Sequence, residues 1–275
     1  MRGRAFQLAL AAALVVALTF LLLPLLAIFV RVSPATLARQ FASDVAVDAL
    51  VVSLKTNAVA QTLVVALGTP AAYLLARSRF PGRRLAIALI ELPLVLPPAV
   101  AGIALLAAFG SRGLLGGTLS ALGVSVAFTQ AAVVMAIAFV SSPFYVRQAI
   151  ASFEAVDPAL LDASRTLGAR PFTTFRRVAL PLAAGGLGAG FALSWARGLG
   201  EFGATIMFAG SLQGVTQTLP LAVYAELARN FEVALAVGAF LVAVSAALLV
   251  TVKLLPSWTR FGSISPIRSA PSPSS

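Results

Sequence analysis

DASRTLGARPFTTFRRVALP, the stretch from Asp162 to Pro181, is a polar segment that lies between long apolar stretches of the chain. Just before it, Asp157 is suited to cap a helix, and Pro158 suits the first helical position, where the missing N–H costs nothing. Gly168 can adopt the left-handed conformation that ends a helix. Pro171 can start a second short helix. The segment is therefore predicted to present a capped helix to water, where a soluble partner can grip it.

The composition of the chain indicates a membrane protein. Of its 275 residues, 60% are hydrophobic and only 11% are charged, which leaves too little polar surface for a soluble domain of this length. Leu8–Val30 carries no charge. A secretory signal is the alternative for this stretch, but such apolar regions run to roughly 7–15 residues and are followed by a small-residue cleavage site. We therefore expect it to be retained as a helix.

Six apolar stretches are long enough to cross a bilayer core of about 30 Å as helices. Lipid offers the backbone no hydrogen-bond partners, so these stretches cannot be loops or open strands. We expect an all-α integral membrane protein with six transmembrane helices, at Leu8–Val30, Val51–Ala76, Leu85–Phe109, Val126–Val146, Leu180–Leu199 and Val233–Leu255.

The basic residues predict how these helices are oriented. Most of them fall in the connections that share one side with the Asp162 segment, and few fall in the opposite connections. Positive residues stay in the cytoplasm. Both termini and the Asp162 segment are therefore expected inside the cell, in a multi-pass protein of the cytoplasmic membrane.

Several other functions are disfavoured by the residues present. The net charge of +11 lies at the ends of apolar stretches, without the aromatic residues of a nucleic-acid surface, so no nucleic-acid partner is expected. The chain has no cysteine and no histidine, and we expect no metal site. GLGEFG, Gly198–Gly203, matches a dinucleotide motif but follows no strand. Without a phosphate-binding loop, the chain is predicted to bind no cofactor and to hydrolyse no ATP itself.

The Asp162 segment resembles the cytoplasmic loop of type I ABC importer permeases, whose pattern is E-A-A-x3-G-x9-I-x-L-P. Asp replaces Glu, Ser replaces Ala and Val replaces Ile, and the spacing is kept. In that family the loop docks a coupling helix into a groove of the ATPase subunit. The resemblance, together with the helix caps and apolar face, assigns the coupling motif to Asp157, Leu160, Asp162, Ala163, Ser164, Leu167, Gly168, Val178, Leu180 and Pro181.

A second resemblance concerns the substrate. GEFGATIMFAG (Gly200–Gly210), TQTLPLAVY (Thr216–Tyr224) and ELPLVLPPAVAGIALLAAFG (Glu91–Gly110) are similar to oxyanion importer permeases, and closer to molybdate than to sulfate permeases. The resemblance implies import of molybdate, with tungstate as a further substrate. A sulfate or thiosulfate permease and a non-transporting membrane scaffold are the alternatives.

The family also implies the assembly and the domain layout. It predicts a homodimer in the lipid bilayer, two cytoplasmic ABC ATPase subunits that hold ATP and Mg, and an extracytoplasmic oxyanion-binding protein. Residues 1–50 would hold the first helix and an external connection. Residues 51–255 would form the permease domain, with the coupling loop at 147–180. The Ser- and Pro-rich residues 256–275 are expected to be a disordered cytoplasmic tail.

Polar and helix-breaking residues within the membrane stretches are candidates for the pore or its gate. Glycines and prolines interrupt the helices, and such breaks line cavities or are buried in protein. Close packing of helices, or a purely structural kink, is the alternative. Glu201 is expected to pair with Arg197, four residues away. The candidates are Asn57, Gln61, Pro97, Pro98, Gly200, Glu201, Gly203 and Thr205.

Overall fold

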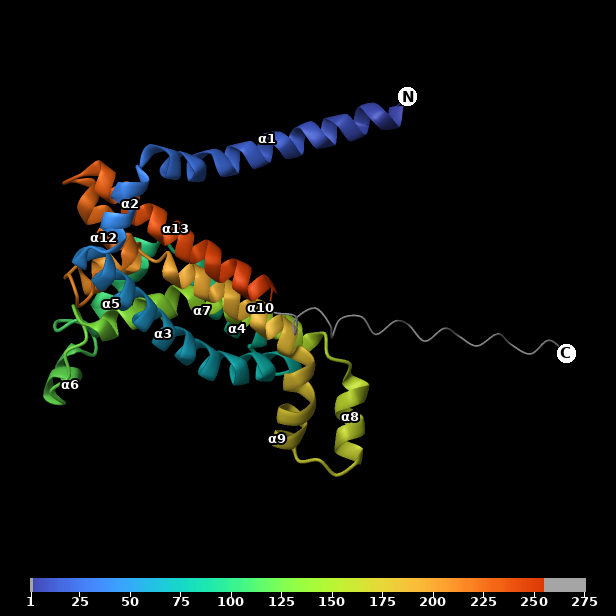
Figure 1. The fold of residues 1–275 in the computed structure, drawn as a ribbon. Helices are drawn as coiled ribbons and strands as arrows, with labels where there is room; N and C mark the ends of the chain where they lie inside the picture. Colours follow the sequence, from blue (N-terminus) through green and yellow to red (C-terminus); the bar gives the residue numbers. More distant parts are fainter. Residues whose placement is uncertain (1, 255–275) are drawn as a thin grey trace.

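The computed structural model describes residues 2–254, and this part of the chain is helical without any β-strand. Figure 1 shows long helices running side by side, with short helices at both ends of the bundle. In chain order the elements are α1 (Arg2–Arg31), α2 (Pro34–Phe41), α3 (Asp44–Arg77), α4 (Arg83–Val95), α5 (Pro98–Phe109), α6 (Gly116–Ala121), α7 (Gln130–Glu154), α8 (Pro158–Thr166), α9 (Pro171–Thr174), the π-helical turn η1 (Phe175–Ala179), α10 (Leu180–Leu199), α11 (Gly203–Ala209), α12 (Leu219–Leu227) and α13 (Phe231–Leu254).

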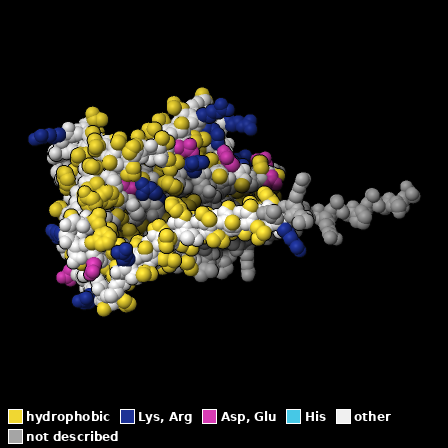
Figure 2. All heavy atoms as spheres, turned by 90° about the horizontal axis from the view of Figure 1, so that it is seen from above, with side chains coloured by type: hydrophobic (Ala, Val, Ile, Leu, Met, Phe, Trp, Pro, Cys, Tyr) yellow, Lys and Arg dark blue, Asp and Glu magenta, His cyan; other side chains and the backbone are white. Residues whose placement is uncertain are grey.

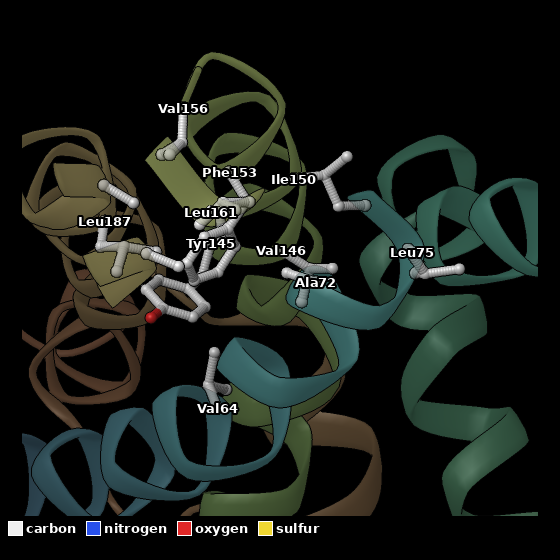
Figure 3. Packing of buried hydrophobic residues seen from close by; sticks show 13 residues of the cluster. Val64, Ala72, Leu75, Tyr145, Val146, Ile150, Phe153, Val156, Leu161 and Leu187 are labelled. Carbon is white, nitrogen blue, oxygen red and sulfur yellow. The ribbon is translucent and has the colours of Figure 1, made fainter. Parts of the chain in front are cut away.

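The centre of the bundle is α7, which packs against α3 on one side and α10 on another. Figure 3 shows the cluster of buried side chains that these helices share, with Tyr145 and Phe153 of α7 among residues of α3 and α10. Gly190 permits the close contact with α10, because a Cβ atom there would lie 2.9 Å from the Cβ of Gln148. Small residues at such contacts let membrane helices approach closely and gain dispersion energy.

The predicted third span, Leu85–Phe109, is bent by 115° between α4 and α5, and so differs from a single straight helix. The bend lies at Leu96 and Pro97, which both have extended backbone ψ angles. A proline disfavours helical geometry in the residue before it and donates no N–H bond, so two consecutive prolines end α4. The sequence predicts the break. The large angle lets α5 lie against α11.

The remaining predicted spans each correspond to a helix, but the observed bounds differ from the predicted ones by up to nine residues. Four helical stretches are long and apolar enough to cross a membrane, and the bent pair makes up to five. They are Phe6–Arg31, Asp44–Arg77, Gln130–Glu154 and Pro171–Leu199. The sixth predicted span, Val233–Leu255, corresponds to α13, which runs from Phe231 to Leu254. The predicted disordered tail, 256–275, lies outside the described residues.

The first helix has little contact with the rest of the bundle. None of the apolar window within Phe6–Arg31 is buried in the chain, and Figure 1 shows α1 extending away from the other helices. Figure 2 shows hydrophobic side chains spread over the length of the face that it draws. An apolar surface of this kind is stable in a bilayer, where it contacts lipid hydrocarbon instead of water.

Replacing Gly102 with alanine tests the packing of α5 on α11. The new methyl group would lie 2.6 Å from the carbonyl oxygen of Ala204 and 2.9 Å from its Cα, so one helix must move. We expect a lower melting temperature in detergent, for a cost of about 1–3 kcal/mol. Gly117→Ala is the control, because a Cβ there meets nothing within 4 Å. Equal losses in both variants would contradict this packing.

Candidate coupling loop and membrane site

The α8 helix begins and ends as its sequence predicts. The side chain of Asp157 accepts a hydrogen bond from the N–H of Ala159 at 2.9 Å, which caps the first turn. At the other end Gly168 has a φ of +81°. The N–H of Gly168 bonds to the carbonyl of Arg165 at 2.9 Å, and that of Ala169 to Ser164 at 3.1 Å. This pair of bonds is a Schellman motif, which satisfies carbonyls at the end of a helix.

The α8 helix attaches to the bundle by one leucine and exposes two others. Leu161 is buried in the core cluster, whereas Leu160 is 47% and Leu167 is 88% exposed. Sequence reasoning missed Leu161, because Leu160 and Leu161 are adjacent and either one fits an apolar helix face. The hydroxyls of Ser164 and Thr174 lie 3.1 Å apart and join α8 to α9.

Beside α8 is an apolar groove of about 600 Å³ that reaches the start of α10. Its lining includes most of the predicted coupling motif, so the motif residues gather at one place at the end of the bundle. Asp162 lies outside the groove lining and forms an exposed ion pair with Arg165 at 3.1 Å. The lining residues are Leu160, Ala163, Ser164, Leu167, Ala169, Thr173, Arg177, Val178, Pro181 and Leu182.

The helix after the loop contains a π-helical turn just before Pro181. In η1 the N–H of Leu180 bonds to the carbonyl of Phe175, five residues earlier. Pro181 has no N–H to donate, and a local π turn is one way in which a helix accommodates such a gap. α9, η1 and α10 therefore continue as one helix from Pro171 to Leu199. The loop is thus joined without a break to a membrane span.

At the other end of α10, two interrupted helices meet. α10 ends at Leu199 and α11 begins at Gly203. A Cβ at Gly203 would lie 2.7 Å from the Cβ of Pro98, so the break after α10 packs directly on the bend between α4 and α5. The structure thus brings together the predicted candidates Pro98 and Gly203, which are about a hundred residues apart in the chain.

An ion pair between the partly exposed Arg197 and the buried Glu201 stabilises this second break. Arg197 Nη2 lies 2.6 Å from Glu201 Oε2, as predicted, although Glu201 lies beyond the end of α10. Glu201 is 2% exposed, and its Oε1 accepts a bond from the N–H of Ala204 at 2.7 Å. The Glu201 carboxylate therefore neutralises the Arg197 guanidinium and also accepts a hydrogen bond from a backbone N–H at the start of α11. Thr205, in the same helix, has a buried hydroxyl without a hydrogen-bond partner.

Asn57 and Gln61 lie one helical turn apart on α3, as predicted, but both are buried between helices. Asn57 donates to the carbonyl of Trp195 at 3.2 Å. Gln61 donates to the hydroxyl of Ser141 at 3.1 Å and accepts from the hydroxyl of Ser194 at 2.7 Å. In this conformation the two amides join α3 to α7 and α10. Their role in a pore stays a prediction.

A mostly apolar groove of about 640 Å³ runs along α3, α7 and α10 next to these amides. Its polar groups include the hydroxyls of Thr69 and Tyr145, which lie 2.5 Å apart. They also include the side chain of Trp195, whose indole N–H is buried without a partner. Over residues 2–254, no group of three or more acidic side chains is placed to hold a metal ion.

Comparison with known proteins identifies the family to which this chain belongs. Residues 68–260 match the model of the family described as binding-protein-dependent transport system inner membrane component. The chain belongs to this family. It is an ABC importer permease with an all-α fold, and a multi-pass protein of the inner membrane.

Two curated relatives illustrate the range of similarity. The molybdenum transport system permease protein ModB of Mycobacterium tuberculosis is 47% identical over 236 residues, which cover 83% of this chain and 87% of the relative. The sulfate transport system permease protein CysT of Salmonella typhimurium is 36% identical over 261 residues, covering 94% of each chain.

A solved structure supports the fold. The chain resembles a chain of a bacterial alginate ABC transporter in complex with a periplasmic protein that binds an alginate pentasaccharide. The TM-score is 0.75, and the likeness covers 91% of this chain and 93% of the other. The sequence identity is 15%, so this likeness concerns the fold alone.

Replacing Gln61 with leucine tests the buried network. The change keeps the volume but leaves the hydroxyls of Ser141 and Ser194 each short of one bond. We expect a loss of stability of about 1–3 kcal/mol, measured as a lower melting temperature in detergent. Thr62→Val is the matched control, because the hydroxyl of this exposed neighbour bonds only to Ala58 of its own helix. A leucine variant as stable as the control would contradict the account.

Proposed function

We propose that this protein is the membrane-spanning permease subunit of an ATP-driven importer that carries molybdate, with tungstate as a further substrate, across the cytoplasmic membrane. The observation that carries the proposal is the 47% identity with a ModB permease over most of both chains. The capped α8 helix supports it, because a permease without its own phosphate-binding loop needs a surface that an ATPase can move.

The proposed assembly contains two copies of this chain, two cytoplasmic ABC ATPase subunits and an extracytoplasmic oxyanion-binding protein. ATP and Mg would be held by the ATPase subunits. The basic residues favour a cytoplasmic position for α8 and for both termini.

In this proposal α8 is the coupling helix. Leu160 and Leu167 would enter a groove of the ATPase subunit, as apolar side chains of a helix do in helix-in-groove recognition. Leu161 is buried in the bundle, so α8 cannot slide freely over the permease when it is pushed. The continuous helix from Pro171 to Leu199 would then carry the displacement toward the broken helices near Glu201.

A divalent oxyanion needs polar groups along its route, because an unpaired charge is prohibitively costly in hydrocarbon. We propose that two copies of the chain share one pore, and that the interrupted segments around Pro98 and Gly203 contribute to it. Glu201 is the buried charge of this region, and the partly exposed Arg197 neutralises it. Because its charges cancel, the Arg197–Glu201 pair is suited to fix the break between α10 and α11 in place rather than to bind the anion.

A sulfate permease is the second candidate, because CysT is 36% identical over 94% of this chain. Reconstitution into liposomes with the ATPase subunits and the binding protein distinguishes the two. We expect ATP-dependent uptake of molybdate, with sulfate excluded when both anions are present at equal concentration. Uptake of sulfate in preference to molybdate would overturn the substrate. An assembled complex that takes up neither anion would favour a scaffold.

Two substitutions at Gly168 test the coupling loop. A Cβ at this residue meets nothing within 4 Å, so the cost of a substitution is set by the positive φ angle alone. Valine disfavours this conformation, by roughly 1–2 kcal/mol, whereas asparagine adopts it more readily. We expect Gly168→Val to lower uptake severalfold and Gly168→Asn to keep most of it. The docking assignment would be wrong if both variants kept full uptake and their ATPase subunits.

A further inference from the structure

The last side chain of α3 is bonded to the turn between α7 and α8. Nη2 of Arg77 donates to the carbonyl of Phe153 at 2.5 Å and to that of Val156 at 2.6 Å. Phe153 belongs to the last turn of α7, and Val156 lies in the short connection before Pro158 begins α8. One guanidinium nitrogen therefore spans the junction through which α8 is attached to the bundle.

A second arginine extends this connection to α4. Nε of Arg83 donates to the carbonyl of Leu75 at 2.6 Å, near the end of α3. Its Nη2 donates to Oε1 of Glu154 at 2.6 Å, at the end of α7. The Arg83 and Glu154 side chains are 28% and 48% exposed, so this contact is weaker than the first.

Aromatic rings join the same junction to the helix that follows the loop. The Phe153 side chain is fully buried, and its ring meets that of Tyr73 edge-on with centroids 5.2 Å apart. Tyr73 in turn lies 4.8 Å from Phe175 of η1. The ends of α3 and α7 and the start of the continuous helix that contains α10 therefore meet around one residue.

The chemistry of a helix end explains why arginine suits this position. The last carbonyls of a helix lack intrahelical partners and carry the negative end of the helix dipole. A guanidinium satisfies them with charge-assisted bonds, which are shorter and stronger than neutral ones. The neighbouring Arg79 and Arg84 are exposed instead, as expected of residues that only orient the helices.

We propose that Arg77 is a positioning residue that transmits the displacement of α8 to α3, so that the ATPase moves α3 and α7 together. The Arg83–Glu154 contact would pass part of the same displacement to α4 and hence to the bent pair. Without Arg77, α8 would still pull on α7 and α10 through the chain. α3 would then follow through the more exposed Arg83 contact and through its packing and hydrogen bonds with α7 and α10. This inference rests on the proposed function.

The test compares Arg77→Gln, Arg77→Lys and Arg79→Gln in the complete complex reconstituted with its ATPase subunits and binding protein. The quantity measured is molybdate taken up per ATP hydrolysed. We expect a loss of about tenfold for Arg77→Gln, the upper part of the range for coupling residues. Lysine should restore part of it, because one ammonium nitrogen can donate both bonds. Arg79→Gln should keep the wild-type ratio. A wild-type ratio in Arg77→Gln would overturn the proposal.

Hydrogen exchange provides a readout that does not depend on transport. In the wild-type complex, ATP should change the exchange of α8 and of residues 74–78 at the end of α3. In Arg77→Gln the change should persist in α8 and be much smaller at the end of α3, where only the Arg83 contact with Leu75 remains. If ATP alters both segments equally in the variant, Arg77 is not the connection.

Failure of the proposed function and failure of the Arg77 proposal give different results. If the wild-type complex imports no oxyanion, the proposed function fails, and the exchange experiment still decides on Arg77. If Arg77→Gln does not assemble, Arg83→Gln removes the more exposed contact of the same junction. We expect this variant to lower the uptake ratio by about threefold, and an unchanged ratio would count against the junction.

Discussion

The packing of α7 between α3 and α10 is the constraint on which the remaining structure depends. Lipid tails solvate the apolar surface of every helix equally well, so the hydrophobic effect does not select helix partners. Close packing and buried hydrogen bonds decide which helices associate. Gln61 bonds to Ser141 and Ser194 of two different helices, and the glycines of α10 let its backbone approach α7. These three helices bond to one another through buried polar side chains. The helix breaks elsewhere are tolerated because they pack against this bundle. The bend after α4 and the break after α10 are packed against each other, and the carboxylate of Glu201 satisfies the start of α11.

The two ends of the α3, α7 and α10 bundle differ in structure and in proposed role. At one end, the junction around Phe153 gathers α3, α7 and η1 beside the coupling loop. At the other end, α5 and α11 interrupt the membrane helices where a polar solute would need backbone and side-chain groups. In the proposed mechanism, a displacement of α8 would reach this junction before it reaches the broken segments. Coupling between distant sites is carried by packed side chains, hydrogen-bond networks and rigid secondary elements.

Local chemistry made the two ends of α8 predictable. Asp157, Pro158 and Gly168 decide where α8 begins and ends, and the structure follows them. The choice between Leu160 and Leu161 as the buried residue was not predictable, because contacts with residues distant in sequence decide it. The same holds for Asn57 and Gln61, whose shared face follows from helical spacing, while their burial depends on α7 and α10. Prolines likewise reveal the break in the third span, but the 115° angle comes with the packing of α5 on α11.

The central claim is that α8 lies in the cytoplasm as the point where an ATPase pushes on the bundle. The chain contains no cysteine, so Arg165→Cys would carry a single reactive thiol on the exposed face of α8. Membrane vesicles of both orientations, treated with a membrane-impermeant maleimide, test the claim directly. Labelling is expected in inside-out vesicles, and bound ATPase subunits should protect the thiol. Labelling from the outside of intact, right-side-out vesicles would contradict the account.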